Sequence, residues 1–386
     1  MGGAVTQHLG WRWCLWIFLP PTGLIALVFL LLRIPDQVGL EKSSTVSTVC
    51  GLHHKLDFVG FLIFTPACVM FLLAVSWGGS KYAWGSAATI GLLCGSGVMA
   101  AIFGGWMWHY GDRAMIPPRI VMKPVVLYGC ILSMVQGGAF LMLQYYLPLW
   151  FQSVKGASPE EGGVMMLPTC VAQIVAGIGC SALLRTIPYA PLWSFFGNAA
   201  TAIASGLMTT FIPSTSSGKW IGYQIIGGVG RGIAMQMPVL AAQSALPESE
   251  ISIATANLLF FQYFGGTFLN CIAKTVFINA LGPALAQYAP HVDPKRVIAA
   301  GATDFLHVIR PQDVEGVKLA YNKALTTTFW LPTAFAIVGF VFSYGLGRHR
   351  IGIKKPTKKS GKEEAEKGSN HEDISVEPDG GAKTSS

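Results

Sequence analysis

Residues 58–75 read FVGFLIFTPACVMFLLAV, an apolar stretch without a charged side chain. Eight further stretches of this kind cover most of the remaining chain. The nine stretches are 14–32, 58–75, 87–108, 125–151, 164–184, 192–212, 221–242, 254–280 and 326–346. Each is close to the ~20 residues that a helix needs to cross a hydrocarbon core of about 30 Å. Because lipid offers an open backbone no hydrogen-bond partner, the repetition predicts an all-α fold, a polytopic bundle of about nine transmembrane helices.

The composition excludes an ordinary soluble domain. Of the 386 residues, 52% are hydrophobic and only 12% are charged, whereas soluble domains carry about 25% charged residues. The net charge of +8 has its largest cluster directly after the last apolar stretch. The cluster consists of Arg348, Arg350, Lys354, Lys355, Lys358 and Lys359. Such a cluster typically places a segment on the cytoplasmic side, so no nucleic-acid partner is expected.

Catalytic and metal-binding motifs were sought without success. Seven of the eight cysteines lie inside apolar stretches, and no CxxC pair occurs, so we expect packing thiols rather than disulfides or a zinc site. The sequence contains no GxSxG, HExxH, Walker loop or GxGxxG motif. The prediction is therefore a protein that is not an enzyme and has no cofactor.

Several groups of residues resemble one family, the 14-span drug:proton antiporters of the major facilitator superfamily, and in particular its fungal branch that exports toxins and other secondary metabolites. The matching groups are Gly10-Trp11-Arg12-Trp13-Cys14, Trp77-Gly78-Gly79-Ser80-Lys81, Tyr145-Tyr146-Leu147-Pro148, Gly228 with Gly230-Arg231-Gly232 and Gln236-Met237-Pro238, and Phe261-Gln262-Tyr263-Phe264-Gly265-Gly266. They occur in the family's order. The resemblance implies a partial major facilitator fold.

The resemblance also implies a domain organisation. Residues 1–33 would be the last helix of an N-terminal transporter domain, and 34–124 would hold two inserted linker spans with cytosolic loops. Residues 125–347 would form the C-terminal six-helix domain, with a long extracytoplasmic loop at 281–325. The tail at 348–386 is rich in Lys, Glu, Gly and Ser and is expected to be disordered and cytoplasmic. The family's first five spans are missing from this pattern.

The implied function is proton-coupled efflux of a hydrophobic drug, toxin or secondary metabolite. Its partners would be that small substrate, protons and the lipid bilayer of the plasma membrane, or of a vacuole or vesicle. Alternating access needs two domains that move about one site. The alternative is therefore a truncated, non-transporting membrane remnant or isoform that needs a partner half or self-association.

Arg231 is a charged residue in the middle of an apolar stretch, and such residues are functional candidates because their burial is costly. Gln224 lies seven residues earlier and thus on about the same helix face. Gln236 belongs to the same family motif. Arg231 would hold an anionic or carbonyl-bearing substrate or pair with an acidic group elsewhere; alternatively, it bonds to carbonyls of a neighbouring helix.

The resemblance places the helix of Arg231 and the helix of residues 125–151 beside a central cavity. Gln136 and Gln144 are spaced eight apart on the latter helix. Tyr145 follows, and these amphipathic side chains suit a cavity for planar molecules. The competing interpretation is hydrogen bonding between helices for the glutamines and an interfacial aromatic belt for the tyrosines. For Tyr146, next to Leu147-Pro148, we expect the belt.

A polar stripe marks the stretch 254–280, with Gln262 and Asn270 as further cavity candidates. Lys274 follows near its outer end and is expected to extend its ammonium group to the lipid headgroups. The stretches contain no Asp or Glu. Asp57 precedes one of them directly, where we expect it to cap a helix.

Overall fold

The computed structural model describes residues 10–32, 57–79, 82–293 and 309–347, together with Gly3, Val5 and Val297. Within these ranges the regular secondary structure is helical, apart from an isolated bridge between Gly78 and Tyr82. The helices are α2 (Trp11–Trp16), α3 (Leu19–Leu31), α5 (Phe58–Trp77), α6 (Ala87–Tyr110), α7 (Pro118–Val121), α8 (Pro124–Ser153), α9 (Pro159–Met165), α10 (Leu167–Leu183), α11 (Ala190–Met208), α12 (Ser217–Ala234), α13 (Met237–Ala245), α14 (Glu248–Tyr288), α16 (Val314–Thr328) and α17 (Trp330–Phe342), followed by the short 3-10 helix η3 (Ser343–Leu346). The predicted tail at 348–386 lies outside the described residues.

The predicted all-α membrane bundle is confirmed. In the described part of the chain, eight helical segments are long and apolar enough to cross a membrane. The ninth predicted stretch, 192–212, also forms a helix, α11, but is not among these eight. α11 carries buried polar residues at Ser194, Asn198, Thr201 and Ser205. These residues lower its hydropathy and face neighbouring helices.

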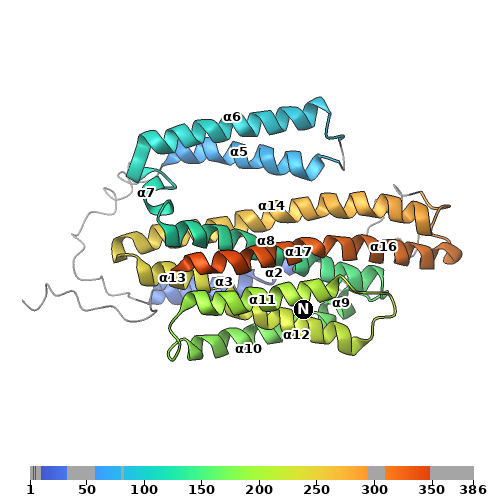
Figure 1. Ribbon diagram of the computed structural model, residues 1–386. Helices are drawn as coiled ribbons and strands as arrows, with labels where there is room; N and C mark the ends of the chain where they lie inside the picture. Colours follow the sequence, from blue (N-terminus) through green and yellow to red (C-terminus); the bar gives the residue numbers. More distant parts are fainter. Residues whose placement is uncertain are drawn as a thin grey trace, which may run out of the picture. The chain divides into compact units, whose positions relative to one another are not determined.

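The main bundle is built around α8 and α12. α8 packs against α14, α17 and α13, while α12 packs against both α10 and α11 (Figure 1). The largest fully buried side chains are Trp150, Tyr146, Phe151, Phe211 and Phe329. These aromatic residues come from α8, from the segment just after α11 and from the junction of α16 with α17, so their packing connects several helices.

In the main bundle, prolines divide three of the predicted stretches into shorter helices. α9 gives way to α10 at Met166, two residues before Pro168. α12 gives way to α13 shortly before Pro238, and α16 gives way to α17 at Phe329, before Pro332. Proline lacks a backbone N–H and clashes with the preceding turn, which explains why the regular helix stops at each of these places.

Helices α14 and α16 extend beyond the predicted ends of their apolar stretches. α14 continues past residue 280 to Tyr288, and α16 begins at Val314 instead of residue 326. The predicted loop 281–325 is therefore partly helical. The reason is packing, because Leu281, Leu285 and Val317 are buried in the core that these two helices share.

The α5–α6 pair packs beside α14 (Figure 1). Phenylalanine rings form the seam, with Phe64 5.3 Å from Phe260 and Phe71 4.9 Å from Phe268 between ring centroids. Asp57 caps α5 through a 2.7 Å hydrogen bond from the Gly60 N–H, which confirms the predicted cap.

A buried arginine beside a cavity

The glycines of α12 bring its backbone into contact with two neighbouring helices. A Cβ at Gly228 or Gly232 would lie 2.6 or 2.3 Å from a carbonyl oxygen of α10. A Cβ at Gly230 would lie 2.6 Å from the Gly197 oxygen of α11. Only glycine allows this approach on both sides. These glycines therefore let α12 pack directly between α10 and α11. The Arg231 side chain lies on a different face of α12, toward α8.

Arg231 is buried, with 7% of its surface exposed. Its Nε donates a 3.2 Å hydrogen bond to the Gly227 oxygen of its own helix. The guanidinium carbon lies 5.7 Å from the centre of the Phe140 ring, on α8. Neither ion pair among the described residues, Arg119–Asp112 or Lys123–Glu250, involves Arg231. The alternative interpretation, a bond to a carbonyl of a neighbouring helix, is not the one found, because the acceptor belongs to α12 itself.

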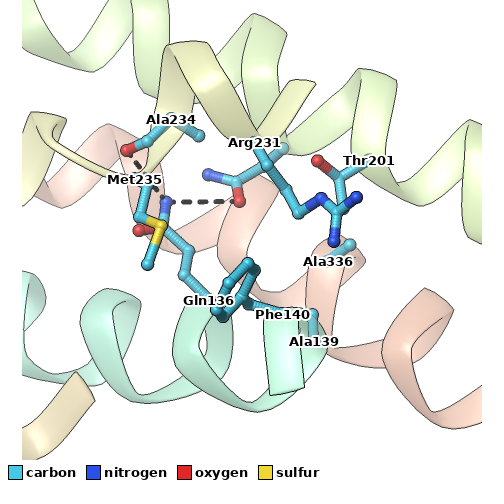
Figure 2. Close-up of a pocket in the computed structure, with 9 residues that line it drawn as sticks. Gln136, Ala139, Phe140, Thr201, Arg231, Ala234, Met235 and Ala336 are labelled. Atoms are coloured by element: carbon cyan, nitrogen blue, oxygen red, sulfur yellow. Dashed lines mark hydrogen bonds between the residues drawn. The ribbon is translucent and has the colours of Figure 1, made fainter. Parts of the chain in front are cut away.

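Two cavities meet at Arg231 and Phe140. The smaller has a volume of about 10 Å³ and lies between Arg231, Gln136, Asn198 and Thr201 (Figure 2). The larger has a volume of about 360 Å³ and opens between α8, α10 and α12. Its lining consists of Phe140, Gln144, Pro148, Met166, Thr169, Cys170, Gln173, Ile174 and Arg231. A volume of this size is in the range of small-molecule sites.

A polar network lies behind the smaller cavity. Gln136 Nε2 donates to Asn198 Oδ1 and to the Ala234 oxygen, each at 3.3 Å (Figure 2). Asn198 Nδ2 in turn donates to the Ser194 oxygen at 2.8 Å and to Ser343 Oγ at 3.1 Å. The network ties α8, α11, α12 and η3 together. Among the described residues, Gln136 Oε1 is buried without a hydrogen-bond partner.

Gln224 is fully buried, and both the oxygen and the nitrogen of its amide form hydrogen bonds with neighbouring groups. Its Oε1 accepts a 2.8 Å hydrogen bond from Thr169 Oγ1, and its Nε2 donates a 2.9 Å bond to the Met165 oxygen. Met165 is the last residue of α9, so its carbonyl has no regular helical partner at the break before α10. Gln224 therefore stabilises the break between α9 and α10, which lies next to the larger cavity.

The other candidates are scattered. Gln144 lines the larger cavity, whereas Gln262, Asn270 and the exposed Gln236 line neither cavity. Tyr145 is 60% exposed and lines neither cavity. The expectation for Tyr146 was wrong: it is 2% exposed, because it packs in the core with its ring centroid 5.8 Å from that of Phe277.

Sequence reasoning missed the contribution of α10. Thr169 and Gln173 stand one helical turn apart on α10 and both line the larger cavity, a spacing that offered a usable signal. Phe140 stands midway between Gln136 and Gln144 on one face of α8. Cys170, expected to be a packing thiol, is exposed and lines the cavity. Lys274 is exposed and donates to Ser76 Oγ at 3.4 Å.

Comparison with known proteins gives a consistent result. The family model of the Major Facilitator Superfamily matches residues 1–270. The chain is 42% identical to the MFS-type transporter pigP of Monascus ruber, over 94% of this chain and 63% of that protein. It is 39% identical to the efflux pump mlcE of Penicillium citrinum, over 93% of this chain and 66% of the pump. The chain is also 38% identical to the MFS-type efflux pump MFS1 of Trichophyton rubrum, over 92% of this chain and 66% of the pump.

The chain thus spans about two thirds of the length of these relatives. The match of the family model over most of the chain, the helical membrane bundle and the glycine-lined helix that carries Arg231 agree with one another. On these grounds the chain belongs to the major facilitator superfamily of membrane transporters.

Proposed function

We propose that this chain serves in the proton-coupled efflux of a small hydrophobic metabolite, drug or toxin that carries an anionic or carbonyl oxygen. The observation that carries the proposal is Arg231, a buried cation with no carboxylate within salt-bridge distance among the described residues, on the wall of a cavity of about 360 Å³. A buried charge is costly unless it is paired. A substrate oxygen provides that partner.

The rest of the cavity suits a mostly apolar molecule. Phe140, Met166 and Ile174 offer apolar surface, and Gln144, Thr169 and Gln173 offer hydrogen bonds. This mixture is typical of small-molecule sites, in which a few polar groups orient a ligand that apolar contacts hold. The Phe140 ring beside the guanidinium also favours a flat substrate that stacks on this ring and directs an oxygen to Arg231.

The six membrane segments from α8 to α17 act in this proposal as the C-terminal transporter domain, residues 125–347, with α5 and α6 as linker spans. The contacts of α8 with α14 and α17, and of α12 with α10 and α11, support one packed unit. The described acidic residues lie at the ends of the helices or between them. We therefore assign proton transfer to groups outside the Arg231 cavity. The proposed location is the plasma membrane.

The test compares Arg231→Ala, Arg231→Lys and the control Lys274→Met in a pump-deficient yeast. Two fluorescent probes are loaded, an aromatic carboxylate and its neutral analogue, which keeps the aromatic rings and carries a methyl group in place of the carboxylate. Loss of a charge-assisted hydrogen bond of about 1.5–3 kcal/mol should reduce carboxylate export by about tenfold or more in Arg231→Ala. Export of the neutral analogue should change little, and Lys274→Met should export both probes normally.

Membrane abundance is measured in the same cells. A collapse of abundance in Arg231→Ala, with no rescue by Arg231→Lys, would show that Arg231 is structural and would overturn the cavity assignment. An inserted wild-type chain that exports neither probe would contradict transport by this chain. That result would favour the alternative function, a membrane protein that acts only with a partner half.

A further inference from the structure

The break between α12 and α13 leaves a carbonyl without its helical partner. In a continuous helix the N–H of residue 238 would donate to the oxygen of Ala234, four residues earlier. Residue 238 is a proline, in the first turn of α13, and has no N–H. The Ala234 oxygen therefore needs another donor, in a segment apolar enough to lie within a membrane.

Gln136 supplies this donor from a different helix. Its Nε2 lies 3.3 Å from the Ala234 oxygen, and Figure 2 shows the side chain reaching from α8 to the end of α12. The second hydrogen of the same nitrogen is directed to Asn198 Oδ1. Asn198 is itself held by Ser194 and Ser343. Contacts with α11 and η3 thus hold the Gln136 amide in the position from which it bonds to α12.

The capped carbonyl lies one turn beyond Arg231. The Arg231 oxygen accepts the hydrogen bond of Met235 N at 3.1 Å, so the last turn of α12 runs from Arg231 to the break. A change in the direction of this turn would move the guanidinium relative to Phe140 and the larger cavity. The contact between Gln136 and Ala234 therefore controls the geometry of Arg231 through the backbone.

We propose that Gln136 is a positioning residue that replaces the hydrogen bond which Pro238 cannot make, and that it thereby fixes Arg231 against the cavity. The proposal rests on the proposed function for its transport consequence. It departs from a role as substrate ligand. Gln136 lines the cavity of about 10 Å³, which is too small for a metabolite, and not the larger one.

The experiment is a double-mutant cycle between Gln136→Leu and Pro238→Ala, in the full chain purified in detergent. Met235 and Gln236 both have right-handed helical backbone angles. An alanine at 238 would restore the N–H that a continuous helix directs to the Ala234 oxygen. Gln136→Leu alone should lower the melting temperature by about 2–4 °C. In the Pro238→Ala background the loss should fall to about half, because the carbonyl no longer depends on Gln136 while Asn198 still loses its donor.

Gln224→Leu provides the matched control. Gln224 also bonds a carbonyl at a helix break, but that carbonyl belongs to Met165. The loss of stability caused by Gln224→Leu should therefore simply add to the effect of Pro238→Ala, without coupling between the two changes. Equal losses for Gln136→Leu in both backgrounds would overturn the proposal. If Gln136→Leu alone does not yield folded protein, recovery of monodisperse protein by Pro238→Ala counts as the rescue, and failure to recover it counts against the proposal.

Export of the carboxylate probe gives the second readout. A positioning role predicts that Gln136→Leu raises the apparent KM severalfold and that Pro238→Ala brings it back toward the wild-type value. A direct contact between Gln136 and the substrate predicts no rescue. The melting cycle needs no substrate, so it distinguishes a failure of this inference from a failure of the proposed function, which Arg231→Ala tests separately.

Discussion

Trp150 and Asn322 form a buried hydrogen bond in which the indole Nε1 donates to the side-chain oxygen at 2.8 Å. Asn322 Nδ2 then donates to the Phe211 oxygen at 3.0 Å. Since Phe211 also stacks on Trp150, with ring centroids 4.5 Å apart, three segments meet at this one amide. The amide lies in the aromatic core that α8 shares with α16.

Replacing Asn322 by leucine should destabilise the protein by about 2–4 kcal/mol, because it strands both the buried indole N–H and the Phe211 carbonyl. Thermal unfolding in detergent provides the measurement. The double variant Trp150→Phe with Asn322→Leu should lose less than the sum of the single losses. A control is Trp330→Phe, whose 62% exposed side chain should make little difference. Strictly additive losses would show that the bond is not a coupled unit.

Glycine at position 230 should be irreplaceable, whereas glycine at position 222 should not be. Alanine at 230 would place its Cβ 2.6 Å from the Gly197 oxygen and 2.7 Å from the Thr201 nitrogen, both backbone atoms that have no rotamer to adopt. We expect Gly230→Ala to remove most folded protein from the membrane. Gly222 on the same helix has nothing within 4 Å of the added atom. Gly222→Ala should therefore be neutral or stabilise by up to ~1 kcal/mol. Similar abundance of the two variants would refute the close contact.

Asp57 should matter more than an ordinary helix cap. Besides the Gly60 N–H, its carboxylate accepts from Trp106 Nε1 and from the Met115 N–H, each at 3.0 Å. Asp57→Ala should therefore loosen α5 from the end of α6, in addition to a capping loss of about 1 kcal/mol. Limited proteolysis of membranes near residue 115 reports this loosening.

The matched control for Asp57 is Ser86→Ala. Ser86 caps α6 through bonds to Thr89 alone, so its loss is local. Only the aspartate variant should expose the new cleavage site. Equal protection in both variants would mean that the two long-range bonds contribute nothing to the pairing of α5 with α6.

Because of Lys155, the folded protein should become slightly more stable as the pH rises in the alkaline range. Its ammonium group donates to the Pro213 and Thr215 oxygens at 2.6 and 2.7 Å, in the turn after α8. Burial lowers the pKa of Lys155 from its usual 10.5. The folded state therefore binds this proton less tightly than the unfolded state, and stability rises as the pH increases through the window just below 10.5.

Melting temperatures between pH 8 and 10.5 test this expectation. Wild type should gain stability relative to Lys155→Met as the pH rises, and the exposed Lys219→Met should leave the wild-type trend unchanged. A trend of opposite sign would indicate that the two carbonyl bonds outweigh the cost of burial.

The apolar stretches were sufficient to predict where helices lie, because in lipid a spanning backbone has to satisfy itself. They did not predict where helices end. α14 and α16 continue beyond their apolar residues because Leu285 and Val317 pack against one another's helices, which is information carried by the partner and not by the segment. The breaks before Pro168 and Pro238 follow from the proline residues themselves, which the apolar pattern does not register.

The candidate site could likewise be predicted from the sequence only in part. Arg231 stood out because a charge in an apolar helix is costly wherever it points. Gln136 and Gln144 stood out as a pair, yet only the structure shows that they line different cavities. Phe140 carries no polar group, so its role depends on which helices adjoin it, whereas the polar residues Thr169 and Gln173 could have been recognised from their spacing of one helical turn. Tyr146 shows the converse, since its position beside Pro148 indicated the membrane interface and packing placed it in the core.

The length of α14 has a practical consequence. Its 41 residues amount to about 60 Å of helix, roughly twice the ~30 Å of a hydrocarbon core. A substantial part of α14 must therefore stand in water, where the start of α16 packs along it. This helical pair offers an epitope for an antibody fragment, and such a fragment would supply the asymmetric mass that image alignment in electron cryomicroscopy requires.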